Sequence, residues 1–386
     1  MKILGIETSC DETAAAVVEN GHILLSNVIQ TQIDIHVQYG GVVPEVAARS
    51  HIEVVNPVIN RALSDANCTW DDIDAIAVTY APGLIGSLLV GTLAARTLAI
   101  IHDKPLYAIH HVEAHVYANF LTEQGRTPNH SPDELVPLAQ SGATGATGGT
   151  ITQTELTLPS KQPDFPILAL IVSGGHTQLV MFRDHGDFEL LGQTQDDAVG
   201  EAFDKVAKII GLPYPGGPSI AKAALSGDPH KYSLPKAKLQ NTYDFSFSGL
   251  KTALLRSVQH ETGHDYTFPS HALHMLLDDA MRADFAASFQ QIAVETLVDK
   301  TERAFNDHSP ASVVIAGGVA ANQELRRQLQ ERLPLKIEYA PMQVCTDNGA
   351  MIATLAYYYS QTMPAADPFD LEVIPSLSMS KTAWAN

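Results

Sequence analysis

Two histidines four residues apart, His111 and His115, are the residues of this chain best suited to bind a metal ion. On a helix, side chains at positions i and i+4 lie on one face, where two imidazoles can bind the same ion. Asp347, in the run Thr-Asp-Asn-Gly, offers a third ligand from a distant segment. Hydrogen-bonded histidines and an Asp347 that only caps the following helix are the structural alternatives.

The position of Glu113 argues against one metal chemistry. A zinc-peptidase site of the HExxH type has its general-base Glu directly after the first histidine. Glu113 stands two residues after His111, about 200° round a helix from it. Two imidazoles and a carboxylate suit Fe(II) and Zn(II) alike, so these ligands do not identify the metal.

Further carboxylates lie where a ligand or a proton could be handled. Glu7, Asp11 and Glu12 surround the first turn of the chain, either as a solvated loop or as groups that act on metal, water or a proton in transit. Asp204 could accept hydrogen bonds from a ribose. The structural alternative is that Asp204 forms a surface ion pair with Lys208, four residues later on the same helix.

Small residues follow two apolar strands, as a phosphate-binding loop requires. Ser173-Gly174-Gly175 follows the strand 167–172, and Gly317-Gly318 follows the strand 312–316. Backbone N–H groups can approach a phosphate only where side chains are absent. Because the strand-turn-strand unit at 2–19 resembles the one at 167–183, these loops indicate a nucleotide cradle between two lobes.

The elements that position these residues alternate between strands and helices, which predicts a duplicated α/β fold with a nucleotide cleft between two lobes. Strands are predicted at 2–7, 14–19, 22–28, 73–79, 106–109, 167–172, 178–183, 312–316 and 336–339, and helices at 45–66, 84–102, 197–210, around 281–292 and at 349–359. The first lobe should span 1–120, completed by 345–386, and the second 165–344. The segment 121–164, with the low-complexity run 141–150, is an insertion, and the tail after Thr362 should be loose.

Composition excludes several classes of protein. Of 386 residues 45% are hydrophobic and 17% charged, as in globular proteins, and a net charge of −19 argues against a whole-surface grip on nucleic acid or an acidic membrane. Three scattered cysteines exclude a disulfide framework. With no export signal, we expect a cytoplasmic protein. The apolar stretch 83–101 should be a buried helix, because Arg96 would cost about 2.5–3.5 kcal/mol in mid-bilayer.

Together these segments resemble the tRNA threonylcarbamoyladenosine transferase family, in its bacterial catalytic form, within the actin, Hsp70 and sugar-kinase (ASKHA) superfamily. The resemblance rests on GIETSCDETAAAV (5–17), GGVVPEVAARSH (40–51), HHVEAH (110–115), VSGGHTQL (172–179), GEAFDK (200–205), YPGGP (214–218), FSFSGLKTA (245–253), GGVAAN (317–322) and CTDNGAMIA (345–353). Two departures stand out. The segment 121–164 is longer than the usual connector. Ile171 replaces the Tyr ligand of archaeal and eukaryotic relatives, which leaves one protein ligand fewer.

This resemblance implies transfer of a threonylcarbamoyl group from threonylcarbamoyl-AMP to N6 of the adenosine 3′ of the anticodon, in tRNAs that read codons beginning with A. It implies a divalent metal, Fe(2+) in preference to Zn(2+), on three ligands that match His111, His115 and Asp347. Acidic residues near the reacting group match Asp11 and Glu12. The adenylate-binding residues match Ile171, Val172, Ser173, Gly174, Gly175, Asp204, Gly217 and Asn322.

The resemblance also implies partners: tRNA, a paralogous ASKHA-fold dimer partner and a P-loop ATPase, with no membrane. Only four Lys or Arg residues occur in the first 100, so a basic surface shared with partners would help tRNA to bind. The competing interpretations are a metallopeptidase, a non-catalytic partner subunit and an ordinary sugar kinase or chaperone-type ATPase. The retained His111, His115 and Asp347 argue against the last two.

Overall fold

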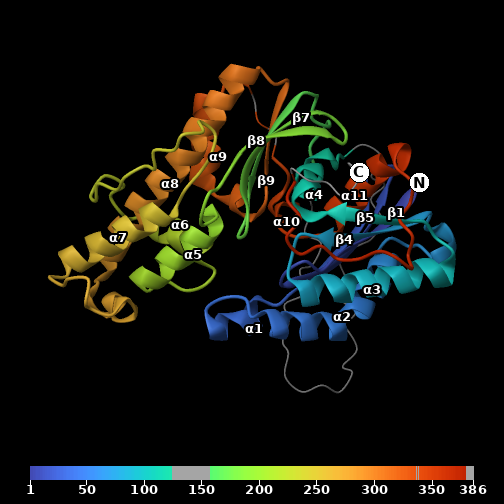
Figure 1. Ribbon diagram of the computed structural model, residues 1–386, viewed down its shortest axis with the longest axis horizontal. Helices are drawn as coiled ribbons and strands as arrows, with labels where there is room; N and C mark the ends of the chain where they lie inside the picture. Colours follow the sequence, from blue (N-terminus) through green and yellow to red (C-terminus); the bar gives the residue numbers. More distant parts are fainter. Residues whose placement is uncertain (124–156, 336, 338, 380–386) are drawn as a thin grey trace. The chain divides into compact units, whose positions relative to one another are not determined.

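The computed structural model describes residues 1–123, 157–335, 337 and 339–379 (Figure 1). It divides into two compact units, Met1–Gln162 with Tyr339–Asn386, and Pro163–Glu338. Each unit has its own mixed β-sheet. The low-complexity run 141–150 lies outside the described residues.

The sheet of the first unit has the strand order β3-β2-β1-β4-β5. Its strands are β1 (Lys2–Glu7), β2 (Glu12–Glu19), β3 (Ile23–Thr31), β4 (Ala75–Ala81) and β5 (Leu106–His110). The first three strands form an antiparallel meander, whereas β1, β4 and β5 run parallel. The carboxyl ends of β1, β4 and β5 therefore meet at one edge of the sheet, the usual place for a ligand in an α/β fold.

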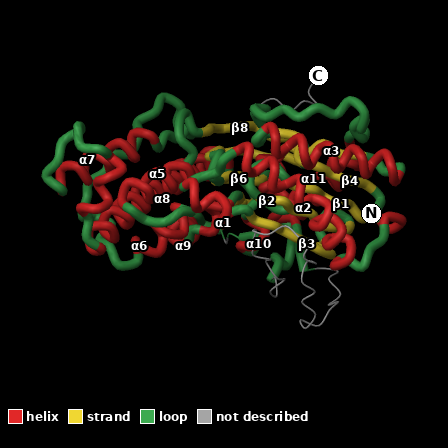
Figure 2. The backbone as a smooth tube through the Cα atoms, turned by 90° about the horizontal axis from the view of Figure 1, so that it is seen from below, coloured by secondary structure: helices red, strands yellow, loops and turns green. Residues whose placement is uncertain are grey.

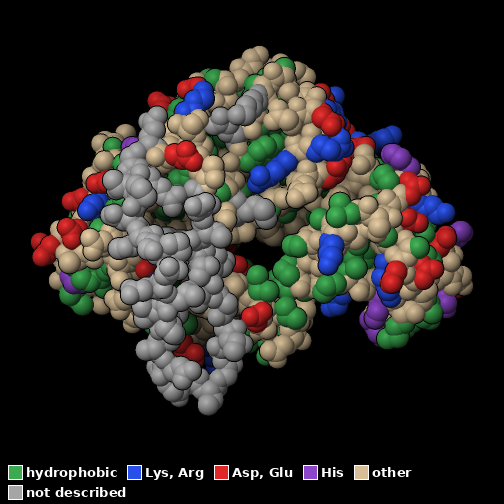
Figure 3. Space-filling view, turned by 180° about the vertical axis from the view of Figure 1, so that it is seen from behind, with side chains coloured by type: hydrophobic (Ala, Val, Ile, Leu, Met, Phe, Trp, Pro, Cys, Tyr) green, Lys and Arg blue, Asp and Glu red, His purple; other side chains and the backbone are tan. Residues whose placement is uncertain are grey.

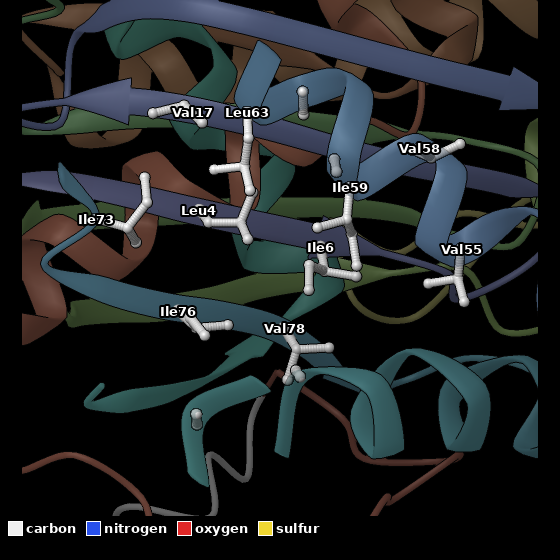
Figure 4. Packing of buried hydrophobic residues seen from close by; sticks show 14 of the residues in the cluster. Leu4, Ile6, Val17, Val55, Val58, Ile59, Leu63, Ile73, Ile76 and Val78 are labelled. Carbon is white, nitrogen blue, oxygen red and sulfur yellow. The ribbon is translucent and has the colours of Figure 1, made fainter. Parts of the chain in front are cut away.

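Helices cover both faces of this sheet because the side chains of a buried strand alternate between its faces. Leu4 and Ile6 of β1 pack with Val55 and Ile59 of α2 (Pro44–Asp65) in a fully apolar core (Figure 4). On the same side α3 (Ile85–His102) packs against α2 and β4.

The opposite face is covered by α11 (Gly349–Thr362), which contacts all five strands. Gly5, between Leu4 and Ile6, faces this helix so closely that a Cβ there would lie 2.2 Å from the Gly349 carbonyl oxygen. A Cβ on Gly349 would lie 2.6 Å from the Ala16 backbone nitrogen. The two glycines thus let the start of α11 touch the sheet, and they fix the place of Asp347, two residues earlier.

The second unit repeats the strand pattern in the order β8-β7-β6-β9, with β6 and β9 parallel. Its strands are β6 (Ile167–Val172), β7 (Thr177–Asp184), β8 (Asp187–Gln193) and β9 (Ser312–Ala316). Its helices are α5 (Val199–Ile210), α6 (Gly216–Ala224), α7 (Ser248–Glu261), α8 (Asp279–His308) and α9 (Gln323–Arg332). These helices pack on one another, as the clustered red tubes of Figure 2 show, and α8 also contacts β6. The predicted duplicated α/β fold is confirmed.

Some elements differ from the sequence prediction. Strand β8 and helices α6, α7 and α9 were not predicted, because their apolar residues are few or interrupted by polar runs. No strand is assigned to the described part of 336–339, of which 336 and 338 lie outside the described residues. The short helices α1 (Ile33–His36), α4 (His111–Tyr117) and α10 (Met342–Cys345) complete the α-helices of the described chain.

The described part of the segment after Thr362, residues 363–379, is bound rather than loose, so the prediction was wrong for this part, and residues 380–386 lie outside the described residues. The Ala366 N–H donates to the Leu106 carbonyl at 2.8 Å, and the Ile374 N–H donates to the Tyr80 carbonyl at 3.0 Å. The guanidinium of Arg96 donates to the carbonyls of residues 368, 369 and 371. Backbone hydrogen bonds, which hydropathy does not reveal, hold this segment along the sheet.

Helix α3 is, among the described residues, the one helix whose length and composition would allow it to cross a membrane. Its inner face is buried as predicted, with Leu88, Ala95 and Ala99 at most 2% exposed. Its outer face is not buried: Ile85 and Leu93 are 61% and 54% exposed. The prediction of a buried helix therefore holds for one face only.

Candidate metal centre and nucleotide loops

The metal candidates of the first unit lie at the carboxyl edge of its parallel strands. Helix α4 begins at His111, directly after β5, with His110 as its N-cap. The side chain of His110 accepts a hydrogen bond from the Glu113 N–H at 3.4 Å. Because α4 packs against α11, its histidines come next to the residues that precede α11.

His111, His115 and Asp347 meet at this edge, as the sequence predicted. The Nε2 atoms of His111 and His115 lie 3.5 and 3.3 Å from Asp347 Oδ1, and one ligand atom from each of the three residues lies within 4.8 Å of the others. Ligands bound at about 2.1 Å to one tetrahedral metal are separated by roughly 3.4 Å. The three side chains therefore have the spacing of a metal site.

His115 provides an independent test of this fit. It is 1% exposed, and among the described residues neither of its ring nitrogens makes a hydrogen bond, since Nε2 lies 3.3 Å from Asp347 Oδ1 without hydrogen-bond geometry. Leaving a buried polar group unpaired costs about 1–3 kcal/mol. An ion bound to Nε2 would satisfy one of the two nitrogens, so a metal fits this site better than a hydrogen-bonded histidine does.

Charge at the centre also favours a cation. Burial alone would lower the pKa of His111, but the carboxylates of Asp347 and Glu7 outweigh it and raise the pKa to about 9. Without metal, His111 is therefore protonated near neutral pH. A metal must displace its Nε2 proton, so metal binding should release a proton.

Asp347 does not cap helix α11. Asn348 is the N-cap, and its side-chain oxygen accepts a hydrogen bond from the Met351 N–H at 3.0 Å. The helix-cap alternative considered for Asp347 is therefore wrong, and its carboxylate faces the two histidines.

The loop between β1 and β2 carries Asp11 and leads into Glu12, the first residue of β2, and Glu12 interacts electrostatically with Asp347 of the same centre. His51 Nε2 and the Ser87 hydroxyl lie 3.0 and 3.1 Å from the Cys10 carbonyl oxygen, which pins this loop to α2 and α3. Burial and the charges of Asp11 and Asp347 raise the pKa of Glu12 well above its usual value. Burial likewise raises the pKa of the Cys10 thiol, which disfavours its reactive thiolate form.

Glu113 is buried away from the metal candidates. Its Oε2 accepts a hydrogen bond from the Tyr359 hydroxyl at 2.6 Å, and burial raises its pKa to about 7. Its carboxylate is directed toward Tyr359 of α11 and is not part of the cluster of candidate ligands, so its position argues against the general base of a peptidase. The structure thus agrees with the spacing argument from the sequence.

In the second unit, the predicted nucleotide loops also lie at the carboxyl edge of parallel strands. Ile171 of β6 pairs with Ala316 of β9, so the loops that start at Ser173 and Gly317 leave the sheet together. The Ser173 carbonyl accepts a hydrogen bond from the Gly200 N–H at 3.3 Å, which attaches the start of α5 to this edge.

The glycines of these loops fall into two groups. A Cβ on Gly317, which has φ +90°, would lie 2.4 Å from the Val172 carbonyl oxygen, so packing requires this glycine. A Cβ on Gly174, Gly175 or Gly217 would meet nothing within 4 Å. Packing does not require these three, and their open backbone suits a ligand that must come close.

The remaining predicted substrate residues differ in exposure and in partners. Asp204 Oδ1 accepts a hydrogen bond from the Gly216 N–H at 2.6 Å, at the start of α6. Asn322 caps α9 and donates to Gln290 Oε1 at 3.0 Å. Ile171 and Val172 are fully buried strand residues. Their side chains belong to the core, so they can only position the loop that follows.

Glu7 is the residue whose place the sequence did not indicate. It was one of three acidic residues at the first turn, but its side chain is fully buried and accepts a hydrogen bond from His111 Nδ1 at 3.1 Å. The available signal was its position as the last residue of an otherwise apolar strand.

Comparison with known proteins relates nearly the whole sequence to one family. The sequence model of the family described as tRNA N6-adenosine threonylcarbamoyltransferase matches residues 23–149 and 146–354. Proteins of that name from Thermomicrobium roseum, Symbiobacterium thermophilum and Gloeobacter violaceus are 49%, 45% and 43% identical to this chain. These matches cover 97%, 98% and 97% of this chain and 95%, 96% and 97% of the respective relatives.

Among solved structures, full-length HypF in its phosphate- and nucleotide-bound form is similar in fold, with a TM-score of 0.51 and 14% sequence identity. The match covers 95% of this chain and 56% of the HypF chain. That likeness concerns the fold alone. The sequence relationships extend over nearly the whole chain, and the family model includes His111, His115, Asp347 and the glycine loops of the second unit. The chain therefore belongs to the tRNA N6-adenosine threonylcarbamoyltransferase family.

Proposed function

We propose that this protein transfers the threonylcarbamoyl group of threonylcarbamoyl-AMP to N6 of the adenosine 3′ of the anticodon, in tRNAs that read codons beginning with A. The observation that carries the proposal is the convergence of His111, His115 and Asp347, with an unsatisfied buried imidazole, in a member of this transferase family. The mixed anhydride already contains a good leaving group, AMP. The protein must therefore orient its substrates more than activate them.

The three ligands would hold one divalent metal, which supplies Lewis-acid polarisation of the threonylcarbamoyl carbonyl. Two histidines and one carboxylate suit Fe(II) and Zn(II) alike, so the preference for Fe(2+) over Zn(2+) rests on the family resemblance and not on the ligand set. His111 and His115 contribute from one helix and Asp347 from the turn before another. Rigid elements thus support every ligand.

The glycine loops of the second unit would bind the adenylate. Open backbone at Gly174, Gly175 and Gly217 leaves N–H groups accessible to the leaving phosphate. Ser173 belongs to the same loop, and its hydroxyl accepts a hydrogen bond from the His176 N–H at 3.1 Å, which shapes the turn. Asp204 and Asn322 would complete this surface from the neighbouring helices.

Asp11 and Glu12 would handle the proton that the exocyclic amine loses after attack. A general base works best when its pKa lies near the operating pH, and burial beside Asp11 and Asp347 moves the pKa of Glu12 upward. The loop that carries both residues is pinned through the Cys10 carbonyl, so their distance from the metal ligands is restrained.

We further propose that the protein works in the cytoplasm with a paralogous ASKHA-fold partner and a P-loop ATPase. On the face shown in Figure 3, Lys and Arg side chains are scattered among acidic ones rather than gathered in a patch. Arg61 pairs with Asp65 at 2.6 Å, and Arg96 binds backbone carbonyls. The excess of 43 Asp and Glu over 24 Lys and Arg makes phosphate contacts contributed by partners favourable.

An exposed apolar ridge on α3 supports a protein partner in particular. Its members share one helical face, spaced four residues apart, and are 61%, 43% and 54% exposed: Ile85, Leu89 and Leu93. Ile52 on the adjacent α2 is 64% exposed. Contiguous apolar patches of this kind mark protein interaction sites.

The proposal is tested by measuring modified adenosine in tRNA by mass spectrometry, with purified protein, partners, metal and threonylcarbamoyl-AMP. His115→Ala should lose transfer at least ~100-fold. The control His102→Ala, which removes a histidine stacked on Trp70 in the same unit, should retain it. Full activity of His115→Ala would refute the proposal. Peptide hydrolysis by the wild type, abolished by the same substitution, would favour the metallopeptidase alternative.

A further inference from the structure

The carboxylate of Glu7 is buried at the end of β1 and surrounded by hydrogen-bond donors. Its side chain is 0% exposed. Oε1 accepts a hydrogen bond from the Ser9 N–H at 2.5 Å, and Oε2 accepts from the Thr79 hydroxyl and from His111 Nδ1 at 3.1 Å. Burying an ionised carboxylate is costly unless donors of this kind satisfy it. A packing role alone would not require an acid here.

The two ring nitrogens of His111 have different surroundings. Nδ1 faces Glu7 Oε2, with the Ser9 hydroxyl also at 3.1 Å. Nε2 faces Asp347 Oδ1 at 3.5 Å, on the side where the metal ligands converge. A metal-bound imidazole keeps its proton on the other nitrogen, and the partner of that nitrogen determines the tautomer. Within the described part of the chain, His115 has no comparable partner at Nδ1.

We propose that Glu7 is a positioning residue of the metal centre. It holds the Nδ1 proton of His111 so that Nε2 is the ligand, and through the Ser9 N–H it ties the loop of Asp11 and Glu12 to the same carboxylate. This inference rests on the metal centre of the proposed function. It adds that one buried acid couples the orientation of a ligand to the position of the loop that carries the proposed proton acceptors.

The substitution Glu7→Gln separates this role from simple burial. An amide has one acceptor oxygen, so the substituted side chain could accept from either the Ser9 N–H or His111 Nδ1 with little change, but not from both. If its NH₂ group donates to Nδ1, the His111 proton moves to Nε2 and blocks the metal. A purely structural Glu7 would affect the stability of the fold without changing the metal affinity of the folded protein.

The first measurement is the affinity of the full-length protein for Zn(II), by competition with a chromophoric chelator. Loss of a carboxylate partner of a histidine ligand typically weakens metal binding ~10–100-fold, and we expect this for Glu7→Gln. The matched control is Glu113→Gln, which neutralises an equally buried acid on the helix of the ligands. That acid bonds to Tyr359 instead. The control should bind Zn(II) within about threefold of the wild type.

The second measurement needs no variant. Nitrogen-15 NMR of the Zn(II)-loaded wild type, with labelled histidine and the His111 signals assigned by substitution, should show the proton on Nδ1 and the metal on Nε2. Metal on Nδ1, or a Glu7→Gln protein that binds Zn(II) like the wild type, would overturn the inference and leave the proposed function intact. A wild type that binds no Zn(II), Co(II) or Fe(II) would overturn the metal centre itself.

Discussion

Metal binding should stabilise the first unit of this protein and not the second, because all three candidate ligands lie in Met1–Gln162 and Tyr339–Asn386. A ligand at 100 times its Kd adds about 2.7 kcal/mol to the free energy of unfolding. For a unit of 150–250 residues, 1 kcal/mol raises Tm by about 2–4 °C. The expected rise for the first unit is therefore roughly 5–11 °C, reversed by a chelator.

Differential scanning calorimetry gives the size of this rise, and amide hydrogen exchange locates it. Protection should increase in β1, β4, α4 and α11 after metal addition, whereas amides of α5 to α9 should keep their rates. His115→Ala serves as the control, since it removes one ligand and an imidazole that has no hydrogen-bond partner. An equal rise of Tm in His115→Ala, or protection confined to the second unit, would refute the assignment of these ligands.

Two further predictions concern the nucleotide loops and pH. Gly317→Ala should lose about 1–3 kcal/mol of stability, because a residue at φ +90° with its Cβ 2.4 Å from the Val172 carbonyl is strained. Gly174→Ala, with open space at its Cβ, should fold normally but raise KM for the adenylate. Two variants with the same melting temperature and the same KM would contradict this division of the glycines into packing and binding positions. Burial lowers the pKa of His51 below 6.5, so the unfolded chain binds a proton that the folded protein does not. The free energy of unfolding of the protein should therefore fall by up to about 1.4 kcal/mol for each pH unit as the pH drops below 6.5. Urea denaturation at pH 7 and 5.5 should show a smaller loss of unfolding free energy for His51→Gln than for the wild type. The same loss in both proteins would contradict the prediction.

Local patterns predicted the fold well where a segment is strongly apolar or strongly periodic. The strands β1, β6 and β9 and the helices α2 and α3 appear within two residues of their expected bounds. Such segments bury at least one apolar face in any compact fold, so their residues alone specify them. Elements with weaker patterns, such as β8 and α9, form because neighbouring elements bury one of their faces, and no local signal revealed them.

In the candidate site, too, local patterns predicted some features and tertiary packing decided others. Histidines at i and i+4 already predicted that His111 and His115 share a face, and apolar strands followed by glycines predicted the two loops at the sheet edge of the second unit. That Asn348 rather than Asp347 caps α11 depends on where a backbone N–H points. The spacing of residues along the chain does not contain that information.

The sequence by itself determined the duplicated α/β architecture, the ligand types of the candidate metal centre and the family. Each of these depends on hydrophobic periodicity, on residue types or on the spacing of motifs, and all three can be read along the chain. Only the tertiary structure decided that Glu7 bonds to His111, that Glu113 bonds to Tyr359, and that residues 363–379 are held along the sheet by Arg96 and backbone hydrogen bonds. These contacts join residues 104, 246 and 273 positions apart. Which of many buried polar groups meet across such separations depends on how the sheet and its helices pack, and that packing is a property of the whole unit.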